Sequence, residues 1–411
     1  MNGFTTKAIH GVREPDTHHA LRAPVYDSVT FEFESSEDIE NAFRGKKPSH
    51  TYSRITNPTV TDFEKRLTLL SGGLGTIAVS SGMAAISDTI LSIAGAGDNI
   101  VISPFLFGNT FSLLASTLKR WGLEIRFADF RLPETLEQVI DGRTRAVYLE
   151  TITNPQIAVF DIPALSRIAD RHGVLVILDN TVMTPYAFDA RPAGVHIEVL
   201  SATKYISGGG TAVGGAVIDH GNYDWGKNPY FKDDVKAYGK HCFLRRLRQE
   251  VYRNTGACMS PHAAYMLSLG LETLALRIER SFDNALGMAE YLLERKDHVT
   301  SVNYAGLTYS GYHEIAERLF GKRYGGILTF TLESKEKCFR FMDALRIVRR
   351  ATNINDNKTL ILHPASTIYC EFPPEEQAKL GVTDTMLRLS AGIEDKEDLI
   401  ADIEQAFVAL K

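Results

Sequence analysis

One lysine, Lys204, stands among small residues and directly before a run of glycines, in the stretch SATKYISGGGTAVGG that spans residues 201–215. If the chain is extended here, Ser201 and Thr203 point to one side and Lys204 points to the other. Two hydroxyls on one side suit phosphate oxygens, and the glycines let the backbone approach a ligand closely. A lysine at the end of a buried strand loses hydration, which lowers its pKa and makes the amine nucleophilic enough for a Schiff base.

Two other segments place polar groups at the end of a predicted strand. Asp179 follows the apolar run VLVIL, and a carboxylate held in such a low-dielectric place pairs with a buried cation, for example a pyridinium nitrogen. In SSGMAA, residues 80–85, a serine-rich strand end runs through a glycine into a predicted helix. The backbone amides of Gly82 and Met83 would then lie at a helix N-terminus, where a phosphate binds well.

Each of these signals also has an ordinary structural explanation. Lys204 fits a surface lysine before a flexible loop, Asp179 fits a helix cap or a turn, and many strand–helix turns carry a glycine such as Gly82. The order of lysine before glycines is the reverse of a P-loop, so nucleotide binding is not indicated. Together, however, the three segments offer an amine for an aldehyde, donors for a phosphate and a carboxylate for a ring nitrogen. That combination describes one cofactor, pyridoxal 5′-phosphate (PLP).

Strands that alternate with helices must position these residues. The apolar runs predict strands at 76–81, 98–103, 146–151, 174–180 and 196–204, with helices between them. This alternation predicts an α/β fold with a mostly parallel sheet and helices on both of its faces. The run VLVIL supports this prediction, because consecutive apolar residues fit a strand buried on both sides. Ligands of such sheets bind beyond the carboxyl ends of the strands. The candidate residues are therefore Ser80, Ser81, Thr151 to Asn154, Asp179 and Ser201 to Lys204.

The chain divides into three predicted parts. Residues 1–56 mix polar residues with glycine and proline, and we expect an arm that contacts a neighbouring subunit. Residues 57–256 form the predicted cofactor-binding α/β domain, in which 110–122 favours a helix. Residues 257–411 hold a long helical stretch, short strands and a closing amphipathic helix, which predicts a smaller α+β domain.

Composition excludes several classes of function. The 411 residues have a net charge of -5 with both signs mixed, so no basic footprint for nucleic acid is visible. The N-terminus has no apolar signal region and no run of about 18 apolar residues occurs, so we expect neither secretion nor membrane insertion. The cysteines are scattered without CxxC spacing, which indicates reduced thiols in a cytoplasmic protein and no metal site.

The motifs resemble, in kind and order, those of the Cys/Met-metabolism family of PLP enzymes, the cystathionine γ-synthase-like group. The resemblance covers nearly the whole chain and implies the fold of PLP-dependent transferases of fold type I. It implies a mostly parallel sheet of seven strands with helices on both faces, an N-terminal arm and a smaller α+β C-terminal domain. The motifs are TYSRITNPT (51–59), SSGMAA (80–85), ETITNPQ (150–156), LDNTVMTP (178–185), SATKYISGG (201–209), GLETLALRIERSFDNA (270–285), HPAST (363–367) and LRLSAGIED (387–395).

The resemblance implies roles for residues around the cofactor. Lys204 should bind it covalently, Asp179 should pair with the ring nitrogen, and Asn154 should bond the ring 3′-oxygen. Tyr52 and Arg54 should reach the cofactor phosphate of a neighbouring subunit, which makes the site a property of a dimer. Arginine suits this place because its planar fork bonds phosphate oxygens in pairs. Lys204, Tyr52 and Asp179 are the predicted catalytic residues.

The resemblance also implies a substrate. Arg388 should clamp the substrate α-carboxylate with Asn353 and Thr359 nearby, although a structural salt bridge is the ordinary interpretation of such an arginine. Within the family the chain is most similar to the branch that acts on O-acetyl-L-homoserine, through GNYDW (221–225) and RYGGILTF (323–330). The implied reaction is γ-replacement by a sulfur nucleophile, which yields homocysteine and acetate in methionine biosynthesis.

Some positions depart from the family pattern. Phe107 stands where the family has a ring-stacking tyrosine, and phenylalanine stacks on a cofactor ring but transfers no proton. Asn109 replaces a cysteine of methionine γ-lyases, which weighs against a lyase. Gly209 replaces a common histidine, a change that opens the mouth of the site or reshapes it for another sulfur donor.

Several alternatives stay open at the level of sequence. A γ-lyase that degrades methionine is the second hypothesis, and a PLP-binding regulatory protein that has lost catalysis is the third. The sulfur donor is free sulfide, methanethiol or sulfur on a carrier protein, and the leaving group is acetyl, succinyl or phospho. A site shared across a two-fold axis fits closed symmetry, and we expect a homotetramer built as a dimer of dimers.

Overall fold

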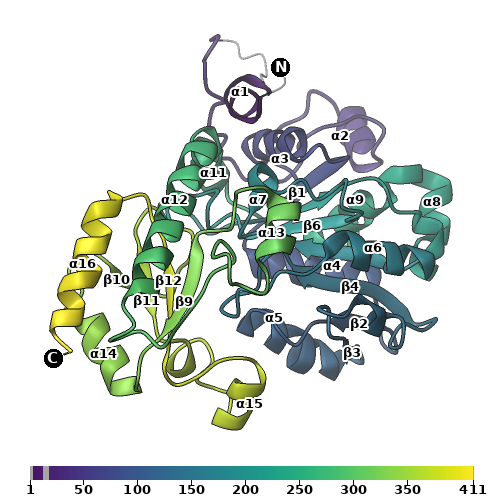
Figure 1. Ribbon diagram of the computed structural model, residues 1–411. Helices are drawn as coiled ribbons and strands as arrows, with labels where there is room; N and C mark the ends of the chain where they lie inside the picture. Colours follow the sequence, from purple (N-terminus) through teal and green to yellow (C-terminus); the bar gives the residue numbers. More distant parts are fainter. Residues whose placement is uncertain (1–2, 13–17, 411) are drawn as a thin grey trace.

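A computed structural model describes residues 3–12 and 18–410 of the chain, so parts of the predicted arm (1–2 and 13–17) and the last residue, 411, lie outside the described residues. Figure 1 shows two sheets beside one another, each accompanied by helices. The α-helices are α1 (Phe4–His10), α2 (Ser36–Phe43), α3 (Pro58–Ser71), α4 (Gly82–Ile93), α5 (Gly108–Ser112), α6 (Ile162–Arg171), α7 (Thr184–Ala187), α8 (Lys232–Tyr238), α9 (Cys242–Arg246), α10 (Arg253–Thr255), α11 (Pro261–Glu272), α12 (Leu274–Glu294), α13 (His313–Phe320), α14 (Lys335–Ala344), α15 (Pro374–Lys379) and α16 (Lys396–Val408).

The larger sheet is mostly parallel, as predicted. In the described part of the chain it has the order β1-β7-β6-β5-β4-β2-β3. Its strands are β1 (Gly75–Val79), β2 (Asn99–Ile102), β3 (Glu124–Phe127), β4 (Thr144–Glu150), β5 (Leu175–Asp179), β6 (Ile197–Leu200) and β7 (Gly215–Asp219). Only β7 runs antiparallel to its neighbours among these strands, while β2 to β6 pair in parallel. The patterns that predicted the other strands gave no expectation of β3 or β7.

Both faces of this sheet are buried. Along β5, Leu175 and Ile177 pack into one apolar cluster with residues of α4, whereas Val176 and Leu178 join a second cluster with residues of α3. Successive side chains of a strand point to opposite faces, so a strand covered on both sides must be apolar at every position. This confirms the prediction made from the run VLVIL.

The smaller sheet lies in the C-terminal part of the chain. Its order is β10-β11-β12-β9-β8 among the described residues, and Figure 1 shows α14 and α16 beside it. The strands are β8 (Ser301–Asn303), β9 (Ile327–Thr331), β10 (Arg349–Arg350), β11 (Leu360–Leu362) and β12 (Met386–Ser390). The two sheets fall within the proposed parts 57–256 and 257–411, and the boundary between these parts stays a prediction.

The helix predicted at 110–122 is not continuous. Helix α5 begins earlier, at Gly108, and is followed by a π-helical turn at Leu113–Thr117 and a 3₁₀ turn at Leu118–Trp121. The segment contains Thr110, Ser112, Ser116 and Thr117, residue types whose helix propensity is lower than that of alanine or leucine. The early start makes Phe107 the residue that precedes α5, directly after the loop that follows β2.

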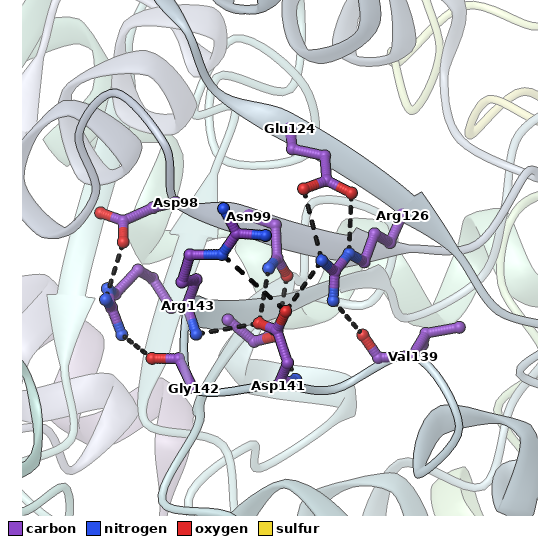
Figure 2. A network of polar contacts seen from close by, with 10 residues as sticks. Asp98, Asn99, Glu124, Arg126, Val139, Asp141, Gly142 and Arg143 are labelled. Carbon is purple, nitrogen blue, oxygen red and sulfur yellow. Dashed lines mark hydrogen bonds and ion pairs between the residues drawn. The ribbon is translucent and has the colours of Figure 1, made fainter.

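A network of polar contacts joins the amino ends of β2, β3 and β4 (Figure 2). Asp141 accepts hydrogen bonds from the Arg143 backbone N–H at 2.8 Å and from Asn99 Nδ2 at 2.9 Å, and it pairs with Arg126 at 2.9 Å. The Arg143 N–H and the other donors hold the pKa of Asp141 below its usual range. These polar groups bond to one another, so we interpret this edge of the sheet as structural and not as a binding site.

Within the described ranges, no helix is both long and apolar enough to cross a membrane. The same residues include no group of three or more His, Cys, Asp or Glu side chains placed to hold a metal ion. The four cysteines are free, and two of them, Cys242 and Cys338, are buried.

Candidate active site

A cavity of about 290 Å³ lies beyond the carboxyl ends of β1, β4, β5 and β6. This is the edge of a parallel sheet at which ligands bind. The cavity brings together most of the predicted site residues, namely Gly82, Met83, Phe107, Asn154, Asp179, Ser201, Thr203, Lys204 and Arg388. It is also lined by residues that sequence reasoning did not single out, including Thr110, Glu150, Thr181, Val213 and Ile354.

The segment Ser201 to Lys204 reaches the cavity as a turn. Strand β6 ends at Leu200, and the Lys204 N–H donates to the Ser201 carbonyl at 3.2 Å. The expectation of an extended chain, with hydroxyls on one side and the lysine on the other, is therefore wrong. The turn brings the side chains of Ser201, Thr203 and Lys204 to the same cavity, and the Thr203 N–H donates to the Gly214 carbonyl at 3.2 Å.

The Lys204 amine is half-buried and bonded to one amide. Its Nζ donates to Asn353 Oδ1 at 2.6 Å. Burial and, to a smaller extent, the nearby Arg388 charge lower the pKa of Lys204 to about 8, and Asp356 acts in the opposite direction. An amine with this pKa is partly unprotonated near neutral pH, which is the form that attacks a carbonyl or accepts a proton.

Asp179 ends β5, makes a turn contact and also lines the cavity. Its Oδ1 accepts from the Thr181 N–H at 3.0 Å, which is the turn bond of the ordinary interpretation. Its Oδ2 accepts from the Tyr148 hydroxyl at 3.2 Å, and the carboxylate faces the cavity. Burial raises the pKa of Asp179. A cation placed against this carboxylate would be strongly favoured, because it would compensate a charge held away from water.

Glu150 is a buried carboxyl that sequence reasoning missed by one position. It ends β4 directly opposite Asp179 in the register, and its Oε1 accepts from the Phe107 N–H at 2.8 Å. Burial, and then the charge of Asp179, raise the pKa of Glu150 to about 8. The signal was present in the sequence, because Glu150 is the first polar residue after the apolar run of β4.

The amino end of α4 forms another wall. Gly82 is its first residue, and Ser81 caps the helix by accepting from the Ala84 N–H at 3.1 Å. A Cβ added to Gly82 would lie 2.6 Å from the Ser201 Cβ, so only glycine fits there. The helix start and the Ser201 turn are thereby brought into direct contact, which places a positive dipole end beside two hydroxyls.

Arg388 on β12 is fully buried and points into the cavity. Its Nη1 donates to Asn154 Oδ1 at 3.2 Å, and its Nη2 donates to the Asn353 carbonyl at 3.1 Å. Within residues 3–12 and 18–410 it has no carboxylate partner, and its Nε has no hydrogen-bond partner. Burial lowers the pKa of Arg388 to about 9. A buried cation of this kind calls for an anionic ligand rather than for a structural salt bridge.

Four predicted site residues are not among those that line the cavity, namely Asn353, Thr359, Tyr52 and Arg54, although Asn353 accepts a hydrogen bond from the Lys204 amine. Thr359 is buried in another network, where its hydroxyl donates to Glu394 at 2.7 Å and accepts from the Gly392 N–H at 2.9 Å. Glu394 therefore holds its hydroxyl, and its place near the substrate stays a prediction. Tyr52 is exposed and Arg54 lies over its ring, away from the cavity of their own chain.

Comparison with known proteins gives consistent matches over the whole chain. A family model described as Cys/Met metabolism PLP-dependent enzyme matches residues 5–408. The O-acetyl-L-homoserine sulfhydrylase of Corynebacterium glutamicum is 38% identical over 426 residues, which cover 99% of this chain and 97% of the relative. The O-acetyl-L-homoserine sulfhydrylase 1 of Thermus thermophilus is 38% identical over 418 residues, covering 98% and 99% of the two chains.

Solved structures agree with this. A putative O-acetylhomoserine (thiol)-lyase from Campylobacter jejuni, which carries a pyridoxyl-lysine monophosphate, matches with a TM-score of 0.92 and 35% identity over 98% of this chain and 99% of that one. The O-acetylhomoserine sulfhydrylase of Wolinella succinogenes matches with a TM-score of 0.77 and 47% identity, over 85% and 97%. Because these matches extend over almost its full length, the chain belongs to the Cys/Met metabolism family of PLP-dependent enzymes.

Proposed function

We propose that this protein catalyses γ-replacement on O-acetyl-L-homoserine, in which a sulfur nucleophile displaces acetate and homocysteine is formed for methionine biosynthesis. Support comes from relatives named as O-acetyl-L-homoserine sulfhydrylases that span nearly the whole chain. The observation that carries the proposal is the Lys204 amine, held half-buried with a lowered pKa in one cavity with Asp179 and Arg388.

The cavity fits PLP. When bound, this cofactor supplies an electron sink through its protonated ring nitrogen. Asp179 would hold the proton on that nitrogen, because its buried carboxylate is stabilised by a neighbouring cation. Ser201, Thr203 and the amino end of α4 would bind the phosphate, in a cradle that a Cβ at Gly82 would fill.

Lys204 and Arg388 would act on the amino-acid substrate. Arg388 orients the α-carboxylate through a guanidinium that has a free donor in the described structure. Lys204, with its pKa near 8, takes the proton from the α carbon and moves protons at the β carbon. Phe107 and Asn154 line the cavity, where Phe107 would stack on the cofactor ring without offering a proton and Asn154 would bond its ring oxygen.

We also propose that the active site is completed by a second subunit within a homotetramer. Tyr52 and Arg54 are suited to a phosphate, yet they lie outside the cavity of their own chain and Tyr52 is exposed. Their use by a neighbouring subunit would account for both facts. Four free cysteines are in keeping with a cytoplasmic enzyme.

The reaction is tested by two assays on the purified protein. With O-acetyl-L-homoserine and sulfide we expect homocysteine, and with methionine alone we expect no 2-oxobutanoate. Formation of 2-oxobutanoate from methionine, without homocysteine synthesis, would assign a γ-lyase instead. Lys204→Ala should abolish turnover and the visible absorbance of the bound cofactor, while Lys236→Ala, at an exposed position, should change neither.

The sulfur donor is the finer part of the proposal. Val213 lines the cavity and is 63% exposed, so it lies at the mouth. A Cβ added to Gly209 would lie 3.5 Å from Thr211 and 3.7 Å from Asn357, which is ordinary contact distance. We propose that this open side admits the donor. Sulfide, methanethiol and a sulfur-carrying protein should be compared at fixed O-acetyl-L-homoserine, and succinyl and phospho esters at fixed sulfide. Equal rates with Gly209→His and the native protein for every donor would exclude entry at this place.

A further inference from the structure

The segment that follows β10 packs against the glycine-rich stretch behind Lys204. The Asn357 N–H donates to the Gly208 carbonyl at 2.6 Å. Gly210 adopts a φ of +61°, and a Cβ there would lie 3.0 Å from Asp356 Oδ2. Glycine is therefore needed at 210 both for its left-handed backbone and for the close approach of the Asp356 carboxylate. This contact explains part of a glycine run that the cofactor alone does not explain.

Asp356 is joined to Lys204 through one amide. Lys204 Nζ donates to Asn353 Oδ1 at 2.6 Å, and Asn353 Nδ2 donates to Asp356 Oδ2 at 3.0 Å. The other carboxylate oxygen of Asp356 accepts from the Lys358 N–H at 3.1 Å. An amide has one accepting and one donating end, so donation to a carboxylate decides which end faces the lysine.

Asp356 has a second effect, because its negative charge raises the pKa of Lys204. Arg388 on β12 places a positive charge near the amine and lowers its pKa, whereas Asp356 raises it. The Asp356 side chain is 10% exposed, and its pairing with Lys358 is long, at 3.9 Å. The carboxylate therefore remains available to attract the Lys204 ammonium across the Asn353 amide.

We propose that Asp356 is a positioning residue that locks the Asn353 amide with its oxygen toward Lys204, so that the pair holds the lysine amine whenever it is not bonded to the cofactor. The inference rests on the proposed function in one respect, since that reaction requires a freed Lys204 to transfer protons at two carbons. A held amine stays near those carbons without a search over the rotamers of a long side chain. Removing the carboxylate lets the amide turn and present its NH₂ to the amine.

The first test measures the amine itself in the full-length protein freed of cofactor. Acetic anhydride reacts with unprotonated amines, so the pH dependence of Lys204 acetylation, followed by mass spectrometry of its peptide, gives the midpoint of its titration. In Asp356→Asn the midpoint should fall by about one pH unit, or roughly tenfold in free amine at a given pH. Asp343→Asn, at a position 75% exposed on α14, is the matched control and should leave the midpoint unchanged. The same midpoint in Asp356→Asn and the native protein would overturn the inference.

The second test separates positioning from general damage in the holoenzyme. Asp356→Asn should lower kcat about tenfold with little change in KM for the amino-acid substrate, because a mispositioned lysine affects proton transfer rather than binding. Since Asp356 holds the amide of Asn353, most of the loss in Asp356→Asn should be absent when Asn353 is already alanine, and only the direct effect of the carboxylate charge should remain in the double variant. Additive losses would overturn the inference. The acetylation result is independent of which reaction the enzyme catalyses, so a γ-lyase outcome would remove the proposed function and leave this inference standing.

Discussion

Glu150 connects two cavity-lining loops through a single buried carboxyl. It accepts from the backbone N–H of Phe107, at 2.8 Å, and from that of Asn154. These two residues would lie against the ring face and the ring oxygen of the cofactor. Because burial, and then the charge of its neighbour Asp179, raise its pKa to about 8, Glu150 is kept protonated over most of the neutral range. The carboxyl thus fixes geometry while adding no second negative charge beside Asp179.

Glu150→Gln should change how stability depends on pH. The pKa of Glu150 rises from 4.5 to about 8 on folding, so between these values the folded chain keeps a proton that the unfolded chain has released. Native stability therefore falls as pH rises through this window, by up to about 5 kcal/mol at 1.4 kcal/mol per unit. Glutamine does not titrate, so the variant does not lose stability in this way. The Tm of the variant minus the Tm of the native protein should therefore increase from pH 5 to pH 8. Parallel Tm curves of the cofactor-free proteins would contradict this.

Arg388→Lys should weaken substrate binding. The Arg388 guanidinium donates to Asn154 and Asn353 and would also donate to the substrate carboxylate. A lysine has a single ammonium group and cannot make these bonds in the same planar arrangement. We expect kcat/KM for O-acetyl-L-homoserine to fall roughly 10- to 100-fold, as for the loss of a hydrogen bond to a charged group. Arg350→Lys, exposed on β10, is the control for a general effect of the exchange. Steady-state kinetics of both variants measure this effect. An unchanged kcat/KM in correctly folded Arg388→Lys would show that Arg388 only stabilises the fold.

At the scale of elements, helices α11 and α12 hold the turn that carries Lys204. Gly270 of α11 lies so close to the Ile206 carbonyl that a side chain has no room. Arg277 of α12 donates to the carbonyls of Tyr205 at 2.5 Å and Gly270 at 2.6 Å. The turn after β6 is therefore held by α11 and α12, which lie more than 50 residues further along the chain.

The start of α4 gives a prediction at the same scale. Gly82→Ala puts a Cβ 2.6 Å from that of Ser201, so the helix end and the turn must separate. Overpacking of this kind costs about 1–3 kcal/mol, and here it opens the proposed phosphate cradle. We expect a higher Kd for PLP, measured by fluorescence quenching of the cofactor-free protein. Gly142→Ala, where a Cβ meets nothing within 4 Å, should bind PLP normally. Unchanged PLP affinity in Gly82→Ala would place the phosphate elsewhere.

At the scale of the whole molecule, the cavity is built from distant parts of the chain. The larger sheet supplies Lys204 and Asp179 at its strand ends, and the smaller sheet supplies Arg388 from β12. The arm holds Tyr52 and Arg54 outside this cavity. If Tyr52 and Arg54 bind the PLP phosphate, they must do so in the cavity of another subunit, so each active site needs two subunits.

Mixing two inactive variants tests the shared site. Lys204→Ala and Arg54→Ala should each be nearly inactive alone. In a mixed dimer one of the two sites then contains both substitutions and the other contains neither, so activity should return after the subunits are exchanged. Continued inactivity, with subunit exchange verified by native mass spectrometry, would place Arg54 in the site of its own chain.

Much of the fold and the site could be predicted from local pattern. Apolar runs and glycines located strands ending at Asp179 and near Lys204, because side-chain type and period depend on a few neighbouring residues. The strand β7 was missed because its apolar run, residues 216–218, is short and directly follows glycines that were interpreted as a loop. Local pattern also gave no indication that Thr359 bonds Glu394, which lies 35 residues further along the chain.

The sequence by itself determined the chemistry of this protein: an amine, a carboxylate and a helix start at the strand ends of an α/β sheet. The tertiary structure alone decided how those groups are tuned. It curled Ser201 to Lys204 into a turn, buried Glu150 beside Asp179, and brought Asn353 and Asp356 to the lysine. Burial and charge depend on packing between distant segments, so pKa values and amide orientations follow from the fold and not from the order of residues.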